Sequence, residues 1–200
     1  ELLSTSQIAA LSSSAVTGLT SEQIDALTLT QIEAFSQIQL RGFTAQQIGA
    51  FDEDDITAMT PAKIAALSAN ALSGLTTDAI SGMTTTQIAG MSGTQIGSLT
   101  VTQMNELEQT QMAAISTTQF AAVTATQLDN LTTTEASYLS GEQIASINTT
   151  TMSLLGTTFL STLSIAQLDA LNGTQIDELT TTQIAALSTE RQAALLKAAA

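Results

Sequence analysis

A spacing of eight residues constrains this chain more than any other feature of its sequence. Starting at Leu3, every eighth residue as far as Leu195 is large and apolar. Twenty-four complete octads lie between Leu3 and Ala194, with no insertion or deletion. Their consensus is Leu-Thr-x-x-Gln-Ile-x-Ala, which residues 179–186 match at every defined position. Self-similarity at a short fixed period is typical of repeat architectures.

An eight-residue period excludes the two simplest regular structures. A straight α-helix turns about 100° per residue, so each octad overshoots two full turns by about 80° and the apolar stripe would wind around the helix. The apolar positions of the octad are one and six, five residues apart, and they would point to opposite faces of a strand. The backbone must therefore change direction once in every octad.

The polar positions indicate how the direction changes. Position two is Ser or Thr in 19 of the 24 octads, and position five is Gln in 15. This spacing is a capping box, in which the hydroxyl accepts from a backbone N–H of the first helical turn and the Gln reaches back to the N–H of the cap. Pro61 follows Thr60 and so occupies the first helical position, where proline is tolerated. We predict one short helix over positions three to eight of each octad.

Glycine at position eight is expected at the bend that follows each helix. Left-handed backbone angles are useful at such a bend, and glycine adopts them without a steric penalty. The glycines at this position are Gly18, Gly42, Gly74, Gly82 and Gly90.

One octad buries too little apolar surface to offset the entropy of ordering eight residues, so the octads must stack on one another. The fold predicted is therefore all-α: a solenoid of very short helices, one per octad, coiled around a Leu/Ile/Ala core with Thr, Ser and Asp facing outward. The handedness and the number of octads per turn are left open. The alternative is a β-solenoid, because threonine runs such as Thr84–Thr86 have strand propensity.

No linker or charge boundary divides the array, so residues 1–194 are expected to form one solenoid domain. Glu1 and Leu2 fit positions seven and eight, which predicts continuation of a longer repeat array or self-association. The pattern weakens at the other end, where Arg191 and Gln192 stand at positions five and six. Residues 188–200 are expected to form an Ala-rich C-terminal helix or cap.

Composition narrows the functional classes. The chain has no His and no Cys, and 4 basic against 18 acidic residues give it a net charge of -14. These counts exclude a Ser-His-Asp triad and a zinc finger, and they disfavour binding to nucleic acid or to an anionic membrane. No apolar stretch approaches the length of a membrane span. We therefore expect no catalytic residues, no cofactor, no bound metal and no membrane insertion.

Three groups of carboxylates are candidate sites. Residues 52–55 read Asp-Glu-Asp-Asp and could offer oxygen ligands to Ca²⁺. The favoured interpretation is that Asp52 caps a helix and the others lie in its first turn, where negative charge suits the helix dipole. Glu106 with Glu108, and Asp177 with Glu178, could be acid/base pairs, but a solvated surface explains them better.

The aromatic residues are read in the same way. Tyr138 and Phe159 occupy unusual octad positions and are expected to mark an irregular or contact surface. Core positions are predicted for the remaining aromatic residues, namely Phe35, Phe43, Phe51 and Phe120.

Residues 179–186, Leu-Thr-Thr-Thr-Gln-Ile-Ala-Ala, resemble the Thr/Gln-rich tandem repeats of very long secreted bacterial surface proteins of the adhesin-like and repeat-in-toxin-like kinds. The resemblance implies an extracellular or cell-surface location and a role as a stalk, a spacer or the body of a fibre. The alternative function is a binding module, in which exposed threonine rows recognise a glycan, ice or a surface, or acidic patches bind Ca²⁺. Capping explains Thr at position two but not at positions three and four.

Overall fold

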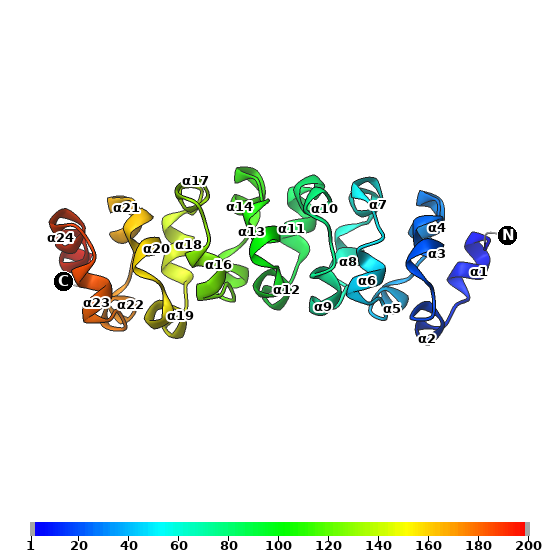
Figure 1. Ribbon diagram of the computed structural model, residues 1–200, viewed down its shortest axis with the longest axis horizontal. Coiled ribbons are helices and arrows are strands. Elements are labelled where there is room, and N and C mark those ends of the chain that lie inside the picture. The colour runs from blue at the N-terminus through cyan, green and yellow to red at the C-terminus, as the bar shows by residue number, and fades with distance from the viewer. Residues whose placement is uncertain (1–2, 199–200) are drawn as a thin grey trace. The chain divides into compact units, whose positions relative to one another are not determined.

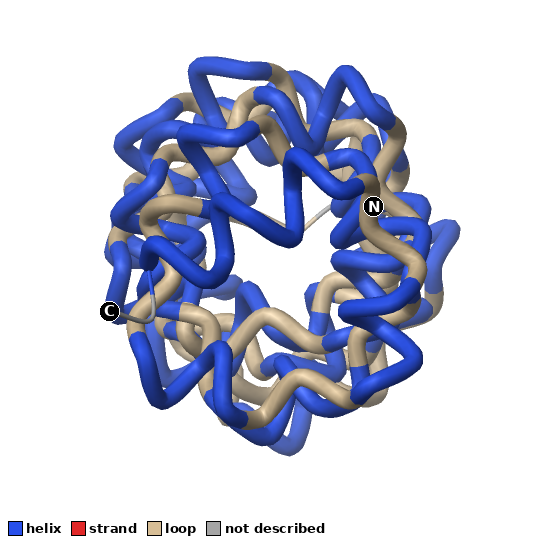
Figure 2. The backbone as a smooth tube through the Cα atoms, turned by 90° about the vertical axis from the view of Figure 1, so that its left-hand side faces the viewer, coloured by secondary structure: helices blue, strands red, loops and turns tan. Residues whose placement is uncertain are grey.

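In the computed structural model, which describes residues 3–198, every regular element is a helix and the described residues contain no strand. Figure 2 shows short helices alternating with short connections along the backbone. The all-α solenoid of very short helices is confirmed, and the β-solenoid alternative is wrong. The predictions made for Glu1, Leu2 and residues 199–200 fall outside the described residues.

The chain divides into two compact units, Glu1–Ala114 and Ile115–Ala200. The helices of the first unit are α1 (Thr5–Ala9), α2 (Ser13–Val16), α3 (Ser21–Asp25), α4 (Leu29–Glu33), α5 (Gln37–Leu40), α6 (Ala45–Ile48), α7 (Glu53–Ala58), α8 (Pro61–Ile64), α9 (Ala69–Leu72), α10 (Thr77–Gly82), α11 (Thr85–Gly90), α12 (Gly93–Ser98), α13 (Val101–Asn105) and α14 (Gln109–Ala114). The helices of the second unit are α15 (Thr117–Phe120), α16 (Ala125–Asp129), α17 (Thr133–Ser137), α18 (Gly141–Ser146), α19 (Thr149–Leu154), α20 (Thr157–Thr162), α21 (Ile165–Leu168), α22 (Gly173–Asp177), α23 (Thr181–Ala185) and α24 (Thr189–Ala198).

Each of these helices begins at position three of its octad, as the capping box predicts. At the start of α13, for example, the Thr100 hydroxyl accepts from the Gln103 backbone N–H at 3.2 Å. In return, Gln103 Oε1 accepts from the Thr100 backbone N–H at 2.9 Å. Two of the N–H groups that a helix start leaves without a partner are thus satisfied within one octad. Every helix except α24 ends by position eight, where the chain turns.

Three octads complete one coil of each unit, a number that the sequence left open. Helices three apart in the chain contact one another: α4 packs on α7, α7 on α10, α15 on α18 and α18 on α21. Figure 1 shows α4, α7 and α10 side by side along one edge of the first unit. A given position of an octad therefore lies against the same position 24 residues away.

The core is formed by positions one and six. Position six is fully buried at residues such as Ile48, Ile64 and Leu72. In the coil of α5 to α7, position one contributes three buried rings. The Phe35 and Phe43 centroids lie 5.2 Å apart in an edge-to-face arrangement, and those of Phe43 and Phe51 lie 5.6 Å apart. Core positions for these rings are confirmed, as is the buried position of Phe120.

The reason given for glycine at position eight is wrong. No glycine among residues 3–198 has a positive φ. The requirement is space between coils instead: a Cβ on Gly74 would lie 1.9 Å from the carbonyl oxygen of Ala45, and one on Gly42 would lie 2.9 Å from that of Ser13. At these two glycines, position eight meets position three of the preceding coil, and the backbones approach too closely there for a side chain.

Candidate functional site

The recurring polar site of this fold is the glutamine at position five, which joins two coils. Gln47 Oε1 accepts from the Thr44 backbone N–H at 3.0 Å and so completes the capping box of α6. Its Nε2 donates to the carbonyl oxygens of Val16 and Leu19, both at 2.8 Å. Val16 ends α2 in the preceding coil, so one side-chain amide satisfies the start of one helix and the end of another.

The same arrangement recurs through both units. In each case Nε2 donates to a position-six carbonyl 31 residues earlier and to a position-one carbonyl 28 residues earlier. The glutamines that make both of these bonds, in addition to Gln47, are Gln39, Gln87, Gln95, Gln103, Gln111, Gln167, Gln175 and Gln183. All are buried. Burial strengthens these bonds and makes their loss costly.

Sequence reasoning found the capping half of this site and missed the half that joins the coils. A signal for the missing half was present. A capping box accepts Glu as readily as Gln at this position, yet the chain has Gln in 15 octads and Glu in one, at Glu135. A carboxylate keeps the acceptor and lacks the donor. The preference for Gln over Glu therefore indicates that the amide donor has a role at position five.

Several octads carry other residues at position five, and two of these residues also donate. Lys63 Nζ donates to the Glu33 carbonyl, and Arg191 Nε donates to the Leu163 carbonyl at 3.3 Å. Phe159 fills the position with an apolar ring that is only 1% exposed. The prediction that Phe159 marks a contact surface is therefore wrong, because position five points into the gap between coils. Tyr138, at the end of α17, is half-buried.

Position five is acidic at Glu135 and at Asp55, and Asp55 belongs to the cluster of residues 52–55. Asp52 Oδ1 accepts from the Asp55 N–H at 2.9 Å, and Asp55 Oδ2 accepts from the Asp52 N–H at 3.1 Å. Asp52 is the N-cap of α7, and the other three residues form its first turn. The capping interpretation of this cluster is confirmed.

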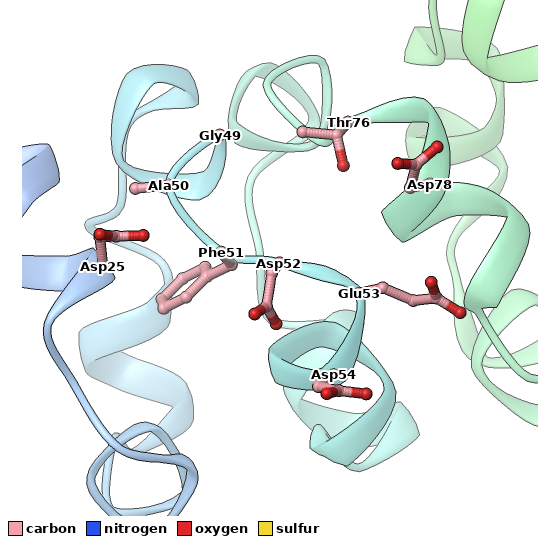
Figure 3. A pocket seen from close by; sticks show the side chains of 9 residues that line it. All are labelled: Asp25, Gly49, Ala50, Phe51, Asp52, Glu53, Asp54, Thr76 and Asp78. Atoms are coloured by element: carbon pink, nitrogen blue, oxygen red, sulfur yellow. The ribbon is translucent and has the colours of Figure 1, made fainter.

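The cluster borders an open hollow of about 480 Å³ that also contains acidic groups from neighbouring coils. Figure 3 shows Asp25 and Asp78 on either side of Asp52, Glu53 and Asp54. Residues 3–198 contain no group of three or more His, Cys, Asp or Glu side chains placed to hold a metal ion. The hollow is lined by an acidic surface.

Asp55 differs from its neighbours because it is half-buried. Burial is the main cause that raises the pKa of its carboxyl, and repulsion from Asp52, Asp54 and Asp25 adds to the increase. By the spacing of the other coils, the carbonyls that face Asp55 belong to Ile24 and Leu27. A carboxylate there has no proton to offer them, whereas a glutamine would have two.

The remaining carboxylate pairs are surface residues. Glu106 is the C-cap of α13 and Glu108 precedes α14. Asp177 is the last residue of α22 and Glu178 is its C-cap. All four residues are exposed. These positions agree with the solvated surface predicted for them.

Comparison with known protein families finds a match over part of the chain. A family described as the ALTTAQ repeat matches residues 2–29 and 48–85. Its six letters read as positions eight, one, two, three, four and five of the octad. The chain is thus a tandem-repeat protein. No curated protein matches it. None of the helices described is long and apolar enough to cross a membrane.

Proposed function

We propose that this chain is a non-catalytic structural module, which serves as a stalk, a spacer or the repeating body of a fibre. The observation that supports this role most strongly is the use of the position-five amide. The buried glutamines at position five donate hydrogen bonds to the preceding coil. The polar interaction that recurs along the chain therefore serves to stack one coil on the next. Quasi-one-dimensional stacking lets length change without redesign of a core.

An extracellular or cell-surface location forms part of the proposal. It rests on the resemblance of the octads to repeats of secreted surface proteins and on the high negative charge, -14 for 200 residues. With 4 basic residues, nucleic acid is not among the partners we propose. Labelling of intact producing cells with an antibody against the chain would test the location, and signal only after cell lysis would contradict it.

The spacer role predicts that a whole coil can be removed without loss of the fold. Deleting residues 59–82 takes out three octads and brings α11 onto the coil of α5 to α7 with all positions in phase. We expect helical circular dichroism per residue to stay unchanged and the maximum dimension in small-angle X-ray scattering to fall by one coil.

A matched deletion of four residues, 59–62, serves as the control because it breaks the octad phase. It should lower helicity and thermal stability, although it removes less of the chain. Equal damage from both deletions would contradict a modular spacer.

A second candidate function is a binding module that uses exposed threonines. Thr85 and Thr86, at positions three and four, are exposed, as are Thr133 and Thr134. Their hydroxyls stand at recurrent intervals within each unit. A glycan array probed with the chain and with the variant T133A/T134A would test this function. Binding that the variant loses would favour it, and a blank array would leave the spacer role as the better account.

A further inference from the structure

Asn172 and Gly173 form a pair of residues that can react with one another. Asparagine occurs five times in the chain, and only Asn172 is followed by glycine. In such a pair the backbone nitrogen of the second residue attacks the side-chain amide carbon of the first and closes a five-membered ring, and the two groups are held close by the chain itself. A side chain on the second residue hinders this approach, and glycine has none. The pair is thus the candidate for a spontaneous modification.

The attacking nitrogen is accessible in the folded chain. Gly173 is the first residue of α22 and is exposed. Within residues 3–198 its backbone N–H donates to no acceptor, as is usual for the first N–H of a helix. A Cβ built on Gly173 would meet nothing within 4 Å, so no neighbouring coil crowds this residue. The nitrogen is therefore open to solvent and to base.

The amide group of Asn172 is held in a way that favours attack. The Thr174 hydroxyl donates to Asn172 Oδ1 at 2.5 Å, and the Gln175 backbone N–H donates to the same atom at 3.0 Å. Attack on Cγ places negative charge on Oδ1, and donors that already point at this oxygen stabilise the charge as it forms. The leaving group is free to depart, because Asn172 Nδ2 bonds to no acceptor in the described part of the chain.

Asn148 shows that a place at the start of a helix does not by itself produce this arrangement. It is the N-cap of α19 and is exposed, as Asn172 is in α22. Among the residues described, its Oδ1 accepts from the Thr151 N–H alone, and its Nδ2 donates to the Ala121 carbonyl at 3.0 Å. The next residue is Thr149, whose branched side chain crowds the backbone nitrogen. The two asparagines thus differ in each feature that the reaction requires.

We propose that Asn172 is a modification site, at which the folded chain deamidates spontaneously with assistance from the Thr174 hydroxyl. Base removes the Gly173 amide proton as the nitrogen bonds to Asn172 Cγ. The bond from Cγ to Nδ2 breaks, and ammonia leaves with a proton taken from solvent. Water then opens the imide ring at either of its carbonyls and yields aspartate or isoaspartate. Nothing is oxidised or reduced, and water is the co-reactant. This inference does not depend on the spacer role.

The two products act differently on the stacking of coils. Aspartate caps a helix as well as asparagine does, and Asp52 caps α7 in this way. Isoaspartate adds a methylene group to the main chain and so displaces the capping oxygen from the Gln175 N–H. Gln175 is buried, and its Nε2 donates to the Ile144 and Ile147 carbonyls at 3.0 and 2.7 Å. Isoaspartate at residue 172 therefore loosens a contact between coils.

Peptide mapping of the aged chain tests the proposal. The chain is incubated at neutral pH in buffer and, in parallel, in urea, and mass spectrometry follows conversion at Asn172 and Asn148. We expect Asn172 to convert several-fold faster than Asn148 in buffer, with isoaspartate among the products. No conversion at Asn172 in buffer, or conversion no faster than at Asn148, would overturn the proposal.

Two variants separate the contributions of the neighbouring residues. G173A has room for its Cβ and should slow conversion several-fold both in buffer and in urea. T174A removes the hydroxyl that donates to Oδ1, so it should slow conversion about fivefold in buffer, as the loss of one net hydrogen bond brings, and leave the rate in urea unchanged. A rate in buffer that T174A does not lower would overturn the assistance from this hydroxyl.

Amide exchange measures the consequence of the modification. Aged chain enriched in isoaspartate should exchange faster than fresh chain over residues 173–177. The variant N172D is the matched control, because it carries the new charge on an unaltered main chain and should keep the protection of α22. Protection that isoaspartate leaves unchanged would overturn the loosening of this contact.

Discussion

At the residue scale, the side chain at position five holds neighbouring coils together through backbone carbonyls. Gln47 and Gln46 are adjacent, but only Gln47 is buried and bonded to the preceding coil. We expect Q47A to lower the free energy of unfolding by about 2–4 kcal/mol, since the Leu19 carbonyl and the Thr44 N–H lose their donor and acceptor and the Val16 carbonyl keeps only the Leu19 N–H. Q46A should change it by less than about 0.5 kcal/mol. Chemical denaturation of the two variants would measure the difference, and equal losses would contradict the role of the buried amide.

Asp55 is, with Glu135, one of two acidic residues at this position, and its raised pKa predicts a pH dependence. Because its pKa is raised in the folded chain above the ordinary 3.8, its contribution to stability is complete below that value and is lost as the pH rises through the raised pKa. The variant D55Q should remove this dependence and supply donors toward the Ile24 and Leu27 carbonyls. We expect a melting temperature higher by roughly 2–4 °C at pH 7 and no gain near pH 3.

Asp54 provides the control for charge alone, because it is exposed and next in sequence. D54N removes one negative charge without placing a donor between coils. If D54N raised the melting temperature as much as D55Q does, general repulsion rather than the position-five site would explain the gain.

At the scale of elements, the turn between helices is limited by the distance between coils. A Cβ on Gly74 would overlap the Ala45 carbonyl, whereas one on Gly173, at the start of α22, meets nothing within 4 Å. G74A should destabilise the chain by about 1–3 kcal/mol or more, because the helices must move apart. G173A should be neutral or stabilising by up to about 1 kcal/mol. Thermal melts would compare them, and a tolerated G74A would contradict the close approach.

Features that depend on interactions between residues close in sequence could be predicted, and features that depend on residues in different coils could not. The helix starts could be predicted because a capping box spans only four residues. At α13, for example, the pair Thr100 and Gln103 is enough to predict where the helix begins. The number of octads per coil could not be predicted, because it depends on hydrogen bonds between residues 28 and 31 apart. The role of Gly74 was missed for the same reason: the carbonyl that excludes its side chain lies in another coil.

At the scale of the whole molecule, the stability of a stacked array is the sum of its coils and the interfaces between them. Gln87, Gln95 and Gln103 make the bonds between two successive coils. Replacing all three with Ala should weaken one interface and divide the melting transition into two in differential scanning calorimetry. Replacing the exposed Thr86, Thr94 and Thr102 with Ala should leave a single transition. One unchanged transition in both variants would show that these amides do not couple the coils.

The acceptors of the bonds between coils are main-chain oxygens, and this has a consequence for how such a chain can change over generations. A carbonyl is the same whichever amino acid carries it, so a glutamine recognises its counterpart by location rather than by identity. Mutations in one coil need no matching mutation in the next. Octads can therefore be copied, exchanged or lost by recombination, and the descendant gene still encodes partners that fit.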